Sequence, residues 1–159
     1  MLTIRDYAPS DWPRLCEIHD AARRRELALA GLEAAFLPLE TAAEREGLFD
    51  YTVIVACPEG DAPAGFAAFS DGELAWLYVD PALSRRGVGR ALAQEALRRM
   101  DAPRVDVEVL CGNAPALALY RSLGFRPVAR ESGHMPGNEG FAVTVDVLSR
   151  ARDGQPANL

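Results

Sequence analysis

The chain has 159 residues, 49% of them hydrophobic and 25% charged, which is the balance of an ordinary globular domain with one core. Its formal net charge of −6 argues against a general nucleic-acid binder, and no apolar run is long enough to span a membrane. The three cysteines have no zinc-ligand spacing, so we expect no metal and a reducing, cytoplasmic environment. From the charge and the lengths of the apolar runs we expect neither nucleic acid nor membrane as a partner. Residues 1–150 are predicted to form one domain, and residues 151–159 a frayed tail.

Hydrophobic periodicity and turn residues divide the chain into predicted strands and helices. The expected strands, in chain order, cover residues 2–7, 51–56, 64–70, 73–79, 105–110, a stretch from 125, and 141–148. The expected helices are one capped by Ser10 or Asp11, then 40–46, 89–100 and 114–123. Residues 132–140, which include His134, are rich in turn formers and are predicted to be a loop.

The first predicted helix has an apolar stripe that includes Leu15 and Ile18. His19 and the charged run 23–26 belong mostly to the other side of this helix. We interpret most of this cluster as a charged face in contact with solvent.

The segment Asp80–Leu92 indicates a site for an anion. A strand ends there at Asp-Pro, and two arginines and two glycines precede the next helix. A helix N-terminus offers unpaired N–H groups and the positive end of its dipole, while glycine lets the backbone approach the anion closely. A Walker loop is excluded because the chain has no lysine, and Leu92 stands where a dinucleotide fingerprint needs a small residue.

A second informative segment runs from Val105 to Phe125. Valines alternate with Asp106 and Glu108, which predicts a strand with two distinct faces. Asn113 is a suitable N-cap for the helix that follows.

These two segments together resemble the signatures of the GNAT superfamily, the acyl-CoA N-acyltransferases. The first signature, Gln/Arg-x-x-Gly-x-Gly/Ala, is matched by Ser84-Arg85-Arg86-Gly87-Val88-Gly89, with Ser84 departing from it. The second, Asn-x-x-Ala-x-x-Leu-Tyr-x-x-x-Gly-Phe, is matched by Asn113, Ala116, Leu119, Tyr120, Gly124 and Phe125. The resemblance implies an α/β (α+β) fold with a mixed, mostly antiparallel sheet of six or seven strands flanked by helices.

The resemblance also implies a site for acetyl-CoA as co-substrate. Members of the family hold the pyrophosphate at the glycine-rich loop, and a β-bulge in the preceding strand exposes N–H groups to the acetyl carbonyl. The residues carried over to cofactor binding are Leu77, Tyr78, Val79, Arg85, Arg86, Gly87, Val88, Gly89, Arg90 and Asn113.

Within the superfamily, the spacing of Glu108, Asn113 and Tyr120 is similar to that of ribosomal-protein N-terminal alanine acetyltransferases. This similarity implies that Glu108 is the general base and Tyr120 the general acid. The alternatives from the residues alone are a solvent-facing Glu108 and a Tyr120 that only packs against the sheet.

The expected activity is transfer of an acetyl group to a primary amine of a small molecule by direct attack. Two other functions stay open, a protein N-terminal acetyltransferase and a non-catalytic domain that binds or senses acyl-CoA. A homodimer formed through the last strands is also possible by resemblance.

Overall fold

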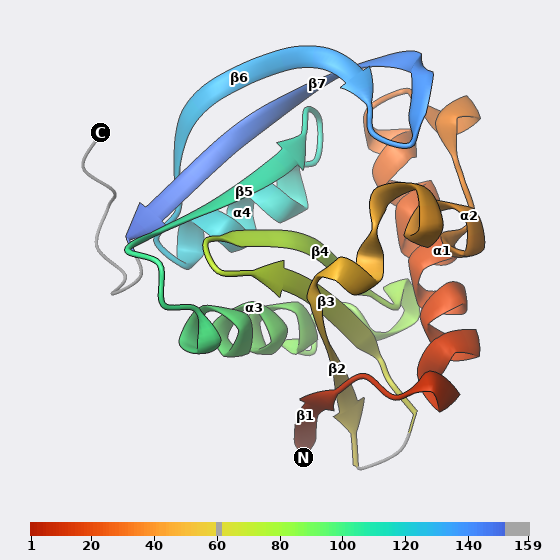
Figure 1. The fold of residues 1–159 in the computed structure, drawn as a ribbon, viewed down its shortest axis with the longest axis vertical. Coiled ribbons are helices and arrows are strands. Elements are labelled where there is room, and N and C mark those ends of the chain that lie inside the picture. Colours follow the sequence, from red (N-terminus) through yellow and green to blue (C-terminus); the bar gives the residue numbers. More distant parts are fainter. Residues whose placement is uncertain (60–61, 152–159) are drawn as a thin grey trace.

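The computed structural model describes residues 1–59 and 62–151, which build a seven-stranded sheet with helices on both of its faces (Figure 1). The sheet order is β1-β2-β3-β4-β5-β7-β6. The strands are β1 (Leu2–Asp6), β2 (Thr52–Pro58), β3 (Gly65–Ser70), β4 (Glu73–Val79), β5 (Arg104–Leu110), β6 (Arg126–Met135) and β7 (Asn138–Ala151). Only β4 and β5 are parallel neighbours in this sheet, so the predicted fold class is confirmed.

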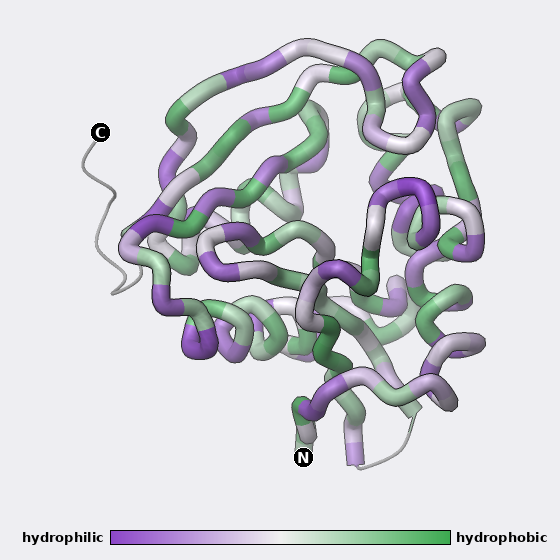
Figure 2. Tube along the Cα trace, in the orientation of Figure 1, coloured by the Kyte–Doolittle hydropathy of each residue, from purple (hydrophilic) through white to green (hydrophobic). Residues whose placement is uncertain are grey.

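The helices are α1 (Trp12–Leu29), α2 (Leu39–Glu46), α3 (Val88–Arg99) and α4 (Ala114–Ser122). α3 packs Leu92 and Ala96 against one face of the sheet, while α1 packs Leu15 and Ile18 against the other. Hydrophobic and hydrophilic residues alternate along α1 and α3 in Figure 2, as expected for helices with one buried side. In the part of the chain that the structure describes, no helix is both long and apolar enough to cross a membrane.

The two parallel strands at the centre of the sheet separate along their length. β4 and β5 are paired at Glu73 and Asp106, whereas β4 stays paired with β3 as far as Val79. Within β4 the register with β3 shifts, which leaves Ala75 as the extra residue of a β-bulge. The second half of β4 therefore has one edge that β5 does not cover.

The predicted loop at 132–140 is wrong. β6 continues to Met135 and β7 begins at Asn138, so most of this segment is a hairpin. Ser132 and Thr144 face each other across it, 3.0 Å apart between their hydroxyl oxygens. β6 is an edge strand whose residues are mostly exposed, and such a strand needs no hydrophobic pattern to pair.

At the other end of the chain, Ala151 pairs with Arg104 and belongs to β7 and not to the predicted tail. Residues 152–159 of that tail lie outside the described residues.

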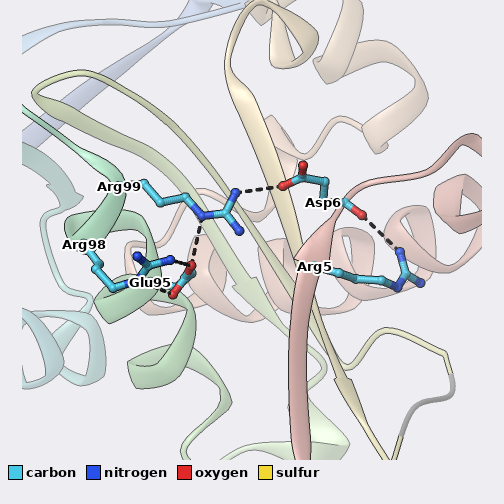
Figure 3. Close-up of polar contacts among 5 residues, drawn as sticks. All are labelled: Arg5, Asp6, Glu95, Arg98 and Arg99. Carbon is cyan, nitrogen blue, oxygen red and sulfur yellow. Dashed lines mark hydrogen bonds and ion pairs between the residues drawn. The ribbon is translucent and has the colours of Figure 1, made fainter.

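Charged side chains join the end of α3 to the edge strand β1 (Figure 3). Arg99 Nη1 lies 2.8 Å from Asp6 Oδ1, and Arg99 Nε lies 2.9 Å from Glu95 Oε1. Arg98 binds the same Glu95 carboxylate, and Arg5 donates to the Asp6 carbonyl oxygen at 3.1 Å. These contacts hold α3 against the sheet at the end remote from the glycine-rich loop.

Candidate functional site

A cleft of about 1570 Å³ opens between β4 and β5 where the two strands separate. We call it the central cleft. The first turn of α3 and the start of α4 line one part of it, and α1, α2 and the β6–β7 turn line the other. Eleven of the twelve predicted site residues line the central cleft; Arg86 does not.

The loop at residues 80–87 leads from β4 into α3. Its shape is fixed by Asp80, whose Oδ1 accepts from the Ala82 N–H at 2.9 Å. Gly87 is the N-cap of α3 with a φ of 79°, and no side chain caps the helix. The N–H groups of the first turn have no partner inside a helix, and a Cβ on Gly87 would meet nothing within 4 Å. The loop therefore presents free N–H groups to an open space.

Arg85 and Arg86 of the loop and Arg90 in the first turn of α3 differ in their surroundings. Arg85 lines the cleft and has a φ of 65°, a left-handed conformation that non-glycine residues seldom adopt. Arg86 is exposed outside the cleft, and Arg90 donates to Ser122 Oγ at 2.5 Å. Arg85 is therefore the arginine of this loop best placed to reach an anion in the cleft.

The free edge of β4 supplies a second row of donors. The Asp80 N–H donates to the Ala64 carbonyl at 2.8 Å, on the β3 side. Because N–H groups alternate between the two edges of a strand, those of Leu77 and Val79 point to the side that β5 leaves open. The β-bulge itself lies at Ala75, two residues before Leu77.

Glu108 lies on β5 at the wall of the central cleft and is exposed to it. Within residues 1–59 and 62–151, its carboxylate has no hydrogen-bond or ion-pair partner. Partial burial, followed by the charges of Glu131 and Glu73, raises the pKa of Glu108 above its ordinary value. A free carboxylate with a raised pKa can accept a proton near neutral pH.

Tyr120 on α4 is only 6% exposed and packs edge-on against Phe125, with ring centroids 5.6 Å apart. Among the described residues its hydroxyl has no hydrogen-bond partner, although the residue lines the central cleft. Burial and the nearby charge of Glu26 raise the pKa of Tyr120, so the hydroxyl keeps its proton. Its hydroxyl is therefore a proton donor that opens onto the cleft.

The predicted solvated face of α1 is wrong for His19, Arg23 and Glu26, all of which line the central cleft. His19 is 2% exposed, and its ring lies 4.9 Å from the ring of Tyr78. The prediction failed because α1 packs against the sheet on one side and borders the central cleft on an adjacent side. Only part of its polar surface therefore faces bulk solvent.

Two further contacts were not predicted, because their partners are far apart in the sequence. Arg14 on α1 reaches Asp80 at 2.6 Å and the Pro63 carbonyl at 2.9 Å. Glu26 accepts a hydrogen bond from Asn113 Nδ2 at 3.1 Å, so the predicted cofactor residue Asn113 is tied to α1.

Carboxylates predominate at the end of the cleft away from the 80–87 loop. Their side chains come from α2, β4, β5, β6 and β7, and the residues are Glu46, Glu73, Glu108, Glu131 and Glu139. Glu46 is exposed to the cleft, and its partial loss of solvation between the cleft walls raises its pKa to about 7, with Arg23 opposing the shift and Glu139 adding to it. No group of His, Cys, Asp and Glu within the described residues could hold a metal ion.

The known proteins to which this chain is similar are acetyltransferases. The sequence model of the acetyltransferase (GNAT) family matches residues 12–125. The chain is 40% identical over 93 residues to a mycothiol acetyltransferase of Acidothermus cellulolyticus, covering 53% of this chain and 28% of that protein. It is 36% identical over 95 residues to the N-alpha-acetyltransferase RimI of Mycobacterium tuberculosis, covering 55% and 60% of the two chains.

Among solved structures, the ribosomal-protein-S18-alanine N-acetyltransferase of Escherichia coli superposes with a TM-score of 0.68 at 25% identity. That match covers 99% of this chain and 97% of the other. The curated relatives are matched over less than two thirds of their own length.

Proposed function

We propose that this chain, which belongs to the acetyltransferase (GNAT) family, transfers an acetyl group from acetyl-CoA to a primary amine of a small molecule. The observation that carries the proposal is the hydroxyl of Tyr120. The tyrosine is buried as a residue, but its hydroxyl has no partner among the described residues and opens onto the cleft that the 80–87 loop and Glu108 also line. A tyrosine with only a structural role usually bonds its hydroxyl to the protein, whereas this hydroxyl is left available to a ligand in the cleft.

The donor half of the proposed site is the uncapped start of α3 together with the free edge of β4. The N–H groups of Val88, Gly89 and Arg90 would hold the CoA pyrophosphate, because a helix N-terminus favours anions. The N–H groups of Leu77 and Val79 would face the acetyl carbonyl oxygen, which gains negative charge during transfer.

In the proposed reaction Glu108 takes a proton from the acceptor ammonium, directly or through water, and so frees the nitrogen lone pair. The nitrogen bonds to the acetyl carbon as the carbon–sulfur bond breaks. The nitrogen then loses its second surplus proton to solvent, and Glu108 passes the first proton on to solvent. Tyr120 donates its proton to the departing sulfur and regains one from solvent. Atoms and charge then balance as an N-acetylated amine, free CoA and one released proton.

We assign the carboxylate-lined end of the cleft, away from the 80–87 loop, to the acceptor. The enclosure of this acceptor end supports a small molecule over a peptide as the acceptor. Arg45 on α2 donates to the Gly137 carbonyl at 2.9 Å, and Asn138 Nδ2 donates to the Ala35 carbonyl at 3.0 Å. These bonds fasten the β6–β7 turn across that end of the cleft. The carboxylates beneath it support an acceptor with positive charge.

A protein N-terminus is the second candidate, because the RimI relative carries the name N-alpha-acetyltransferase. A domain that only binds acyl-CoA is the third. The test is a panel of diamines, aminoglycosides, amino-sugars and N-terminal peptides with acetyl-CoA, followed by thiol release and mass spectrometry of the product. Acetylation of peptides alone would favour the second candidate, and tight acetyl-CoA binding without turnover would favour the third.

A further inference from the structure

Glu26 joins three elements of the proposed site. Its Oε2 accepts from Asn113 Nδ2 at 3.1 Å, and its Oε1 accepts from the Tyr78 hydroxyl at 3.4 Å. Arg23, one turn earlier on α1, forms an ion pair with the same carboxylate. One side chain of the acceptor-side helix therefore contacts β4 and the start of α4 at the same time.

The backbones of α1 and of the turn between β5 and α4 also approach each other closely near this contact. Gly112 has a φ of 100°, and a Cβ at this position would lie 2.7 Å from the carbonyl oxygen of Leu29. Only glycine allows such an approach, so the last turn of α1 rests directly on the turn between β5 and α4. The Glu26–Asn113 hydrogen bond lies beside this backbone contact and is held in place by it.

Asn113 connects Glu26 to α4. Its Oδ1 accepts from the Ala116 N–H at 3.2 Å and caps the helix, while its Nδ2 is bound by Glu26. Tyr120 lies two turns further along the same helix. A shift of Asn113 would therefore move the start of α4 and with it the proposed proton donor.

We infer that Glu26 is a positioning residue that holds Asn113 and Tyr78 so that the acceptor side of the cleft and the Tyr120 hydroxyl are aligned during transfer. The inference rests on the proposed acetyl transfer. Asn113 and Tyr78 are themselves among the residues carried over to cofactor binding, but Glu26 touches neither the start of α3 nor the free N–H edge of β4, so the affinity for acetyl-CoA should change less than the rate. Its loss should appear in kcat.

The variant Glu26→Gln keeps the shape of the side chain, removes its charge and leaves one oxygen for three donors. Because a misplacement of about 1 Å can cost about 100-fold in rate, we expect kcat to fall at least about tenfold and the Kd of acetyl-CoA to change by a smaller factor than kcat. Glu44→Gln is the matched control, since Glu44 lies on the neighbouring helix α2, is exposed and has no hydrogen-bond or ion-pair partner among the described residues.

A double-mutant cycle separates positioning from general damage. If Glu26 acts through Asn113, the variant Glu26→Gln/Asn113→Ala should be no slower than the slower single variant. Losses that multiply would overturn the inference, and so would a kcat for Glu26→Gln within about twofold of the Glu44→Gln control. Should Glu26→Gln lower the melting temperature strongly, Glu26→Asp keeps the charge and must recover part of kcat; no recovery would also overturn the inference.

The same assay separates this inference from the proposed function. A wild-type protein that acetylates no amine in the panel contradicts the proposed function and the inference with it. An active wild type whose kcat is unaffected by Glu26→Gln contradicts the inference alone.

Discussion

Arg14 Nη2 on α1 lies 2.6 Å from Asp80 Oδ2, at the residue where β4 turns into the 80–87 loop. The other oxygen of Asp80 accepts from the Ala82 N–H at 2.9 Å, and the bond to Arg14 lowers the pKa of Asp80. One carboxylate thus shapes the loop of the proposed cofactor site and ties it to the helix on the acceptor side.

The first prediction concerns this pair. Arg14→Gln should raise the Kd of acetyl-CoA about tenfold, because a hydrogen bond between charged groups contributes about 1.5–3 kcal/mol and here keeps the loop in one shape. Isothermal calorimetry measures the change. Arg121→Gln, an exposed arginine on α4, should leave the Kd as in the wild type. Equal affinities for the Arg14 and Arg121 variants would contradict the role given to the pair.

The second prediction tests the loop itself. Gly87→Glu should abolish acetyl-CoA binding, because its carboxylate would enter the open space at the start of α3 and repel the phosphates. The substitution also strains a residue whose φ is 79°. Gly31→Glu is the matched control, since Gly31 has a φ of 68° and equally open surroundings but lies outside the cleft. Binding that survives in the Gly87 variant would remove the loop from the proposed site.

Sequence reasoning succeeded where the determinants are local. The bounds of β4 at Glu73–Val79 match the prediction, because a run of apolar residues there ends at Asp-Pro. Asn113 caps α4 as predicted, since the cap needs only its own side chain and the next turn of helix. The family and the fold class follow from two such local segments and are confirmed.

It failed where distant segments meet. Glu26 is 87 positions from Asn113 and Arg14 is 66 positions from Asp80, so no spacing rule connects them. The predicted loop at 132–140 was wrong because an exposed edge strand carries no hydrophobic alternation. The acceptor and the homodimer stay predictions, since neither depends on a recognisable pattern.

The third prediction uses the raised pKa of Glu46, about 7 in the folded protein against an ordinary value of 4.5. Because the pKa of Glu46 is higher in the folded protein than in the unfolded chain, its contribution to the free energy of unfolding is most favourable below the unfolded pKa of 4.5. That contribution is lost as the pH rises through the folded pKa of about 7. Glu46→Gln should therefore raise the melting temperature relative to the wild type at pH 8, with the gain disappearing near pH 4. The exposed Glu44→Gln on the same helix should follow the wild type at both pH values. A gain that does not depend on pH would contradict the raised pKa of Glu46.

The fourth prediction has the opposite sign and concerns the contacts in Figure 3. Hydrogen bonds from Arg98 and Arg99 lower the pKa of Glu95 to about 2 from 4.5. Their stabilising effect is present above the unfolded pKa and is lost as the pH falls toward 2. Glu95→Gln should lower the melting temperature at pH 7 in low salt, and the difference should shrink at pH 3 and in high salt. A difference that is unchanged by both conditions would show that the ion pairs contribute nothing.

The last prediction assigns the two proton-transfer groups of the proposed reaction. Glu108→Gln and Tyr120→Phe should each lower kcat about 100-fold or more, the usual contribution of a general base or acid, while acetyl-CoA affinity persists. The pH dependence of activity distinguishes the proposed base from the proposed acid. Because burial, Glu131 and Glu73 raise the pKa of Glu108, activity should fall in acid at a pH above 4.5, and this acid limb should vanish in Glu108→Gln.

Glu131→Gln is the matched variant for that limb, since it removes the first neighbouring charge but keeps the proposed base. It should lower the pKa of Glu108 and move the acid limb to lower pH. A limb that stays in place in Glu131→Gln and persists in Glu108→Gln would assign the proton to another group, and His19, buried against Tyr78 in the same cleft, would be the next residue to test.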